Sequence, residues 1–117
     1  MNFRETMAQL KKLGTAQNVK VYKRHGAIEP LFGVSYANLG KLQKRIKRNH
    51  ELADQLWETG NLDARVLATK IADPAKLTAM QANRWVKTVN CYIAGDALGG
   101  LVAQGPIAKG RMEQWME

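Results

Sequence analysis

NHELADQLWETGNLDARVLATKIAD, from Asn49 to Asp73, is the stretch that decides the fold. Apolar residues recur three or four positions apart in each half, which predicts two short amphipathic helices. They are Leu52, Leu56 and Trp57 in the first half, and Leu62, Val66, Leu67 and Ile71 in the second. Gly60 suits a helix C-cap and Asn61 suits the next N-cap. Because such a hairpin cannot bury its own apolar faces, we expect an all-α superhelix of antiparallel helix pairs, a HEAT-like arrangement.

The segments before the hairpin also have helical spacing and capping residues. Phe3, Met7 and Leu10 indicate a helix that ends at Gly14, and Thr15 caps a second helix that ends at Gly26. After a connector over 30–34, Ser35 caps a helix from Tyr36 to about Arg48, with Leu39, Leu42 and Ile46 on its inner face.

The segments after the hairpin continue the pattern. Thr78 and Gln81 form a capping box at the head of a helix that carries Met80, Trp85 and Val89. We interpret 90–104 as a closely packed helix in spite of its glycines, and expect a last short helix with Met112 and Trp115. The spacing of Trp57, Trp85 and Trp115 is that of core residues.

Composition indicates one basic globular domain spanning residues 1–117. The net charge is +8, from 18 Lys and Arg against 10 Asp and Glu, which favours a polyanionic partner over an uncommitted basic surface. The single cysteine, Cys91, cannot form an intramolecular disulfide, and neither His25 nor His50 has a partner at metal-ligand spacing. We therefore expect no metal and no cofactor. No apolar run approaches the roughly 18 residues of a membrane span, so we expect no membrane partner and a cytoplasmic location.

Basic residues gather on the helix that follows Ser35 and recur on later helices. Lys41, Arg45 and Arg48 lie at i, i+4 and i+7, with Lys44 and Lys47 beside them. In a HEAT-like stack, equivalent faces of successive helix pairs align, so Arg65, Arg84 and Lys87 can extend the same stripe. Such a stripe binds DNA phosphates without reading sequence, and we expect Arg84 and Lys87 to be the best contacts. Arg65 is equally compatible with a buried ion pair.

Three stretches resemble the AlkD-like DNA alkylation repair family, the HEAT-like DNA glycosylases. They are FGVSYANLGKL at 32–42, NHELADQLWETGNLDARVLATKIADP at 49–74 and MQANRWVKTVNCYIAGD at 80–96. The resemblance implies a superhelix whose basic concave face holds duplex DNA. It also implies excision of cationic N3- or N7-alkylpurines. Members that act as enzymes are longer, so residues 1–117 correspond to the N-terminal portion of the family's chain.

The same resemblance assigns the candidate catalytic residues. Where family members read close to D-S-W-D-x-x-D, this chain has Asn90 to Asp96. Tyr92 replaces the tryptophan, Ile93 replaces the intervening acid, and Asp96 is the retained carboxylate. A carboxylate near the sugar stabilises the positive charge that develops as the base leaves, and the Tyr92 ring can meet a cationic base. The alternative is structural: Asp96 caps a helix that starts at Ala97, and Tyr92 is plain packing.

Three functions remain compatible with the sequence. The first is a DNA glycosylase with Asp96 at its centre. The second is a catalytically inactive DNA-binding module of the same fold, and the third is a protein-interaction scaffold, because fold does not determine function. A short helical stack also leaves an end face uncovered, so we expect a homodimer through a terminal helix.

Overall fold

The computed structural model describes residues 1–89 and 92–104; residues 90–91 and 105–117, and the side chain of Tyr92, lie outside the described part. Within it the chain forms seven helices: α1 (Phe3–Leu13), α2 (Ala16–Arg24), α3 (Tyr36–Ile46), α4 (His50–Glu58), α5 (Leu62–Ile71), α6 (Ala79–Thr88) and α7 (Tyr92–Ala103). The described residues contain no strand, so the predicted all-α fold is confirmed. The helix expected around Met112 and Trp115 falls outside the described residues.

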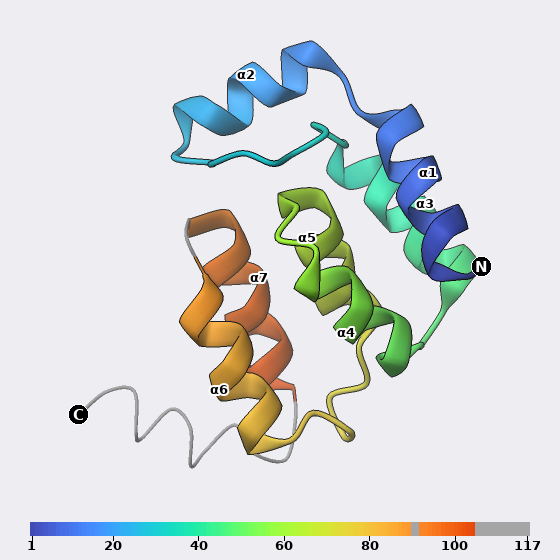
Figure 1. Ribbon diagram of the computed structural model, residues 1–117, viewed down its shortest axis with the longest axis vertical. Coiled ribbons are helices and arrows are strands. Elements are labelled where there is room, and N and C mark those ends of the chain that lie inside the picture. The colour runs from blue at the N-terminus through green and yellow to red at the C-terminus, as the bar shows by residue number, and fades with distance from the viewer. Residues whose placement is uncertain (90–91, 105–117) are drawn as a thin grey trace.

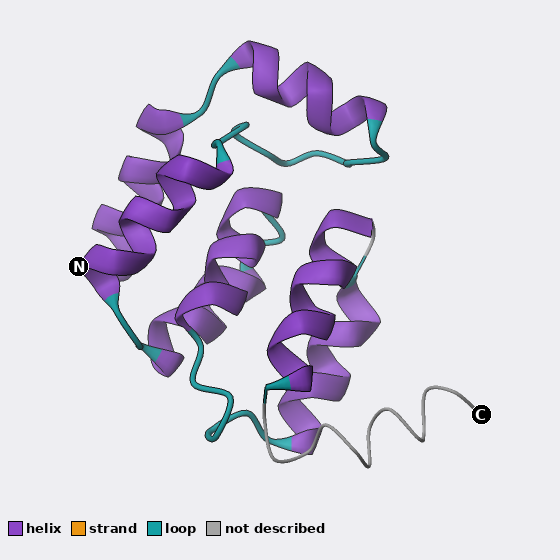
Figure 2. Ribbon diagram, turned by 180° about the vertical axis from the view of Figure 1, so that it is seen from behind, coloured by secondary structure: helices purple, strands orange, loops and turns teal. Residues whose placement is uncertain are grey.

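The helices form two layers. α1, α4 and α6 lie nearer to the viewer in Figure 1, and α3, α5 and α7 lie behind them, where Figure 2 shows them from the other side. α5 is central and packs against α4, α7, α3 and α1. Every residue of α5 except Lys70 is therefore buried, although periodicity alone predicted one buried face. α5 is buried on more than the one predicted face because four other helices pack around it.

The caps of the deciding hairpin form as its sequence predicts. The side chain of Asn61 accepts a hydrogen bond from the Ala64 amide at 3.1 Å and so caps α5. Gly60 has a φ of 75°, a left-handed conformation that glycine adopts without strain. The C-cap of α4 is Thr59, one residue before the expected position. Thr15 and Ser35 cap α2 and α3 in the same way as Asn61.

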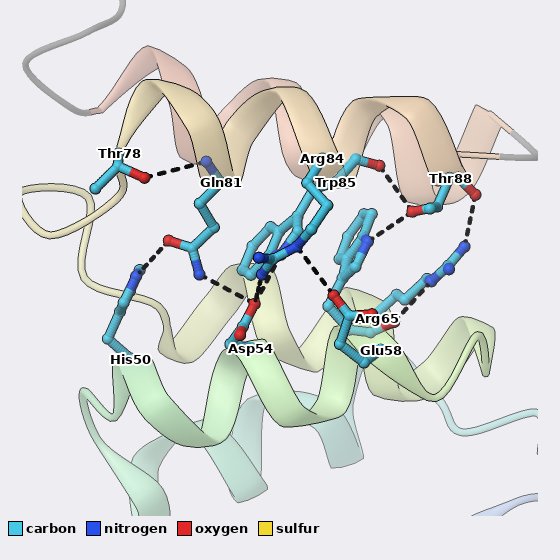
Figure 3. Close-up of polar contacts among 10 residues, drawn as sticks. His50, Asp54, Glu58, Arg65, Thr78, Gln81, Arg84, Trp85 and Thr88 are labelled. Carbon is cyan, nitrogen blue, oxygen red and sulfur yellow. Dashed lines mark hydrogen bonds and ion pairs between the residues drawn. The ribbon is translucent and has the colours of Figure 1, made fainter.

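Three details of the sequence prediction are wrong. α3 ends at Ile46 and not at Arg48. Met80 points away from the core and is 80% exposed. The side chain of Thr78 does cap α6, but the side chain of Gln81 does not complete a capping box. It reaches across to α4 instead, where it contacts His50 and Asp54 (Figure 3).

A buried carboxylate connects α5 to the segment that precedes α3. Asp63 is 2% exposed and accepts hydrogen bonds from the backbone amides of Phe32, Gly33 and Val34, at 2.5, 3.1 and 2.8 Å. Gly33 has a φ of 80°, and a Cβ there would lie 2.5 Å from the carbonyl oxygen of Thr15, so only glycine fits. Through this segment α5 determines where α3 begins.

Candidate nucleic-acid interface

A groove is lined by α3, α5 and α7, the three helices of the layer that faces the viewer in Figure 2. Its volume is about 490 Å³. We call it the central groove. α3 and its C-terminal end contribute Tyr36, Gln43 and Arg48; α5 contributes Val66, Thr69 and Lys70; α7 contributes Ile93, Asp96, Ala97, Gly100, Leu101 and Gln104. Segments far apart in the sequence thus form one concave surface.

A second recess of about 370 Å³ lies beside the central groove and is basic. It is lined by Gly40, Gln43, Lys44, Lys47, Arg48 and Lys70, and we call it the basic recess. Gln43, Arg48 and Lys70 line both spaces, so the two adjoin. None of the residues that line the basic recess is acidic. Four cations therefore converge in this recess at the ends of α3 and α5, although Arg48 also borders a separate recess that Glu51 and Asp73 line.

The end of α3 differs from the continuous basic helix that the sequence predicted. Lys47 has φ 63° and ψ −143°, a conformation rarely adopted by a residue with a Cβ, and its amide donates to the Gln43 carbonyl at 2.7 Å. The chain turns there, and Arg48 Nη1 donates to the Ala72 carbonyl beyond the end of α5 at 2.6 Å. Lys41 and Arg45 remain exposed on α3 but line neither the central groove nor the basic recess.

Asp96 lies where a substrate in the central groove could reach it. It is exposed, and it is the only acidic residue among the described residues that line this groove. The structural alternative, in which Asp96 caps a helix starting at Ala97, is wrong because α7 is continuous from Tyr92 to Ala103. Asp96 therefore sits within the helix, four residues after Tyr92. The Tyr92 side chain lies outside the described part, so its expected role stays a prediction.

Arg84 and Lys87 lie on α6, and no residue of α6 lines the central groove or the basic recess. Arg84 forms ion pairs with two carboxylates of α4, Asp54 and Glu58 (Figure 3). Lys87 is exposed. The geometry thus separates the two expected best phosphate contacts from the concave surface.

Asp54 also accepts hydrogen bonds from the Gln81 side chain and the Trp85 indole, each at 3.1 Å. Partial burial raises the pKa of Asp54, but the bonds from Gln81 and Trp85 and the Arg84 guanidinium outweigh burial and leave the pKa below its usual range. The ionised carboxylate therefore stabilises the contact between α4 and α6.

Arg65 is 7% exposed and holds α4, α5 and α6 together. Its Nε donates to the Trp57 carbonyl at 3.1 Å and its Nη1 donates to the Thr88 carbonyl at 2.8 Å. Its guanidinium carbon lies 5.0 Å from the centroid of the Trp57 ring, which itself stacks on Trp85 at 4.8 Å. Of the two roles that the sequence left open for Arg65, the buried structural one agrees with this geometry.

Residues 6–117 match the family model described as DNA alkylation repair enzyme. The chain belongs to this family.

Proteins of two Listeria species are similar to part of the chain. The chain is 30% identical over 89 residues to an uncharacterized protein of Listeria innocua and to another of Listeria monocytogenes. Each match covers 73% of this chain and 40% of the relative, so the chain spans well under half of those proteins.

One solved structure matches nearly the whole chain. It has a TM-score of 0.94 and 34% identity, and the match covers 99% of this chain and 50% of the other. That protein is described as one of a new family related to the HEAT-like repeat DNA glycosylases, with affinity for branched DNA structures. The likeness confirms the HEAT-like arrangement of this member of the DNA alkylation repair enzyme family.

Sequence reasoning about this family member missed most residues of the concave surface, Tyr36 and Lys70 among them. Lys70 has a faint signal, because it is the one basic residue in the last turn of a helix that is otherwise apolar or buried. Tyr36 has none, because helical spacing places it at the edge of the apolar face of α3 and does not say which helix that edge meets. Among the described residues, no group of three or more His, Cys, Asp or Glu could hold a metal ion. No helix in that part of the chain is long and apolar enough to cross a membrane.

Proposed function

We propose that this protein binds the phosphate backbone of duplex DNA along the central groove and the basic recess, as part of DNA alkylation repair. The observation that carries this proposal is the convergence of Lys44, Lys47, Arg48 and Lys70 with no acidic residue in the recess that they line. These residues lie at or just beyond the C-terminal ends of α3 and α5, two helices that the fold places side by side. Several cations that share one recess without an acidic residue concentrate positive potential and attract a polyanion.

The spacing of these cations suits a nucleic-acid strand. Lys44 lies in the last turn of α3 and Lys47 follows as its C-cap, and the side chains of both line the basic recess. Phosphates follow one another along a strand of duplex DNA at about 3.4 Å of axial rise, so neighbouring lysines can neutralise neighbouring phosphates. The net charge of +8 supports the same partner, and the structural relative's affinity for branched DNA agrees with it.

Salt-dependent affinity for a fluorescein-labelled duplex, measured by fluorescence anisotropy, tests this proposal. The test variant is Lys44→Gln/Lys47→Gln/Lys70→Gln. We expect the slope of log affinity against log salt to become shallower by about 2.7, at about 0.9 per lost phosphate contact.

The matched control removes the same charge from exposed positions outside the basic recess: Lys41→Gln/Arg45→Gln/Lys87→Gln. We expect this control to keep most of the wild-type slope. Equal losses in the two triple variants would show that only net charge matters, and the groove assignment would be wrong.

A second candidate function is glycosidic bond hydrolysis on alkylated DNA, and Asp96 favours it. This exposed carboxylate lines the central groove, which adjoins the basic recess. An alkylated purine is already a cationic leaving group, so it needs no acid catalyst. A carboxylate beside the sugar would stabilise the oxocarbenium character that develops as the base departs.

Release of N7-methylguanine from methylated duplex DNA, quantified by chromatography, tests the second candidate. We expect Asp96→Asn to abolish release while the affinity for unmodified duplex stays within about twofold of wild type. Release that Asp96→Asn leaves unchanged would remove Asp96 from the mechanism. Absence of release from the wild-type chain would leave DNA binding as its function.

A further inference from the structure

One exposed aromatic side chain lies inside the central groove. Tyr36 is 56% exposed and forms part of the wall contributed by α3, while Asp96, Ala97 and Gly100 form part of the wall contributed by α7. The other large exposed apolar side chains of the described residues line neither the central groove nor the basic recess; they are Val21, Ile28, Met80 and Val86. An aromatic ring that keeps a solvent-exposed surface in a groove suits a flat ligand.

The backbone that carries Tyr36 is held firmly. Ser35 caps α3, and its side chain accepts a hydrogen bond from the Asn38 amide at 3.2 Å. The Tyr22 hydroxyl donates to the Val34 carbonyl at 2.6 Å, and the rings of Tyr22 and Tyr36 lie 6.2 Å apart with planes tilted by 54°. The ring of Tyr36 is therefore supported from one side, which lowers the entropy cost of stacking against a ligand.

The opposite wall leaves room for such a ligand. A Cβ added at Gly100 would meet no atom within 4 Å, so the side of α7 that lines the groove is open at this position. Along α3, Tyr36 precedes Lys44 by eight residues, a distance of about 12 Å at 1.5 Å per residue. This distance equals about three to four nucleotides of one strand at 3.4 Å each. One strand can thus place phosphates at the basic recess and a base at Tyr36.

We infer that Tyr36 stacks on an unstacked base of the bound DNA, and that it makes the protein prefer DNA with an exposed base face over continuous duplex. The inference rests on the proposed DNA binding and adds which DNA the protein prefers, namely DNA with an exposed base face. Lysine contacts to phosphate carry no information on base stacking. In a continuous duplex each base already lies between two neighbours, whereas a gap or a branch point presents a free face to an aromatic ring. Stacking of a base on an aromatic side chain contributes about 1–3 kcal/mol.

Anisotropy titrations with two labelled DNAs test this inference: a continuous duplex, and the same duplex with one nucleotide missing from one strand. We expect wild type and Tyr36→Phe to bind the gapped duplex more tightly. We expect Tyr36→Ala to lose about 5- to 100-fold in affinity for the gapped duplex, the loss of one stacked base. Its affinity for the continuous duplex should stay within about twofold of wild type. Met80→Ala, which removes an exposed apolar side chain outside the groove, should leave both affinities unchanged.

A 2-aminopurine placed opposite the gap gives a direct readout of stacking. Its emission should fall on binding wild type or Tyr36→Phe, and should not fall on binding Tyr36→Ala. Equal affinity of wild type for the two DNAs, or an equal effect of Tyr36→Ala on both, would overturn the inference. If wild type still binds continuous duplex with a steep salt dependence, such a result contradicts the role of Tyr36 but does not contradict the proposed function. Absence of salt-dependent binding to either DNA would overturn both.

Discussion

Removal of the Asp63 carboxylate should destabilise this protein far more than removal of other carboxylates. In Asp63→Ala, the backbone amides of Phe32, Gly33 and Val34 lose their acceptor, and the last two belong to buried residues. A hydrogen bond to a charged group contributes about 1.5–3 kcal/mol, and an amide left buried without a partner costs a similar amount. Because the three bonds share one carboxylate and the segment can partly hydrate, we expect a loss of about 3–5 kcal/mol and not the full sum.

Urea unfolding followed by circular dichroism measures this loss. Small proteins have urea m-values of about 1–3 kcal/mol/M, so the midpoint should fall by at least about 1 M. Asp73→Ala is the matched control, because the Asp73 carboxylate accepts one exposed amide, that of Ala75, at 3.0 Å. The control should lose less than about 1 kcal/mol. A loss in Asp63→Ala no larger than in the control would refute the idea that this carboxylate holds the start of α3.

Three further predictions concern the basic recess and the contact between α4 and α6. Lys47→Gly should raise stability by about 1 kcal/mol, because glycine relieves the backbone strain at φ 63° at some cost in unfolded-state entropy. The same variant should bind duplex DNA more weakly, so its stability should rise while its DNA affinity falls. Urea unfolding and anisotropy on one sample measure the two changes. If stability does not rise, the backbone at Lys47 is not strained. Arg84→Gln should leave DNA affinity unchanged and lower the free energy of unfolding by less than about 1 kcal/mol, since its ion pairs are half exposed. A weakened affinity would show that Arg84 contacts DNA. The lowered pKa of Asp54 means that its stabilisation is complete above the unfolded value of about 3.9 and is lost as pH falls through the folded pKa. Asp54→Asn should therefore flatten the acid side of a plot of melting temperature against pH, and an unchanged acid side would show that other groups control it.

Much of the fold follows from local rules that the sequence contains. Thr15, Ser35, Asn61 and Thr78 each cap the helix that they were predicted to cap, because a short side-chain acceptor satisfies the amides of a first turn. Spacing also identified buried residues such as Leu39, since helical periodicity defines which side of a helix is apolar. Asp96 was identified through a family resemblance, and the structure places it in the central groove.

The composition of the concave surface was decided by tertiary structure. Periodicity separates the apolar side of α3 from its polar side, but it does not say which polar residues face α5. Packing directs Lys44 to the basic recess and leaves Lys41 outside it. Arg84 is basic in sequence, yet α4 brings Asp54 and Glu58 to it from about 30 positions away.

The sequence by itself thus determined the helices, their caps and the all-α class, because these depend on contacts within a few residues. Only the tertiary structure decided which charges converge and which are neutralised. Helix packing sets the rotation of each helix relative to its neighbours, and electrostatic interactions depend on distance in space and not on separation along the chain. For Tyr36, Lys44 and Lys70, that rotation places one ring and two cations on the same concave surface.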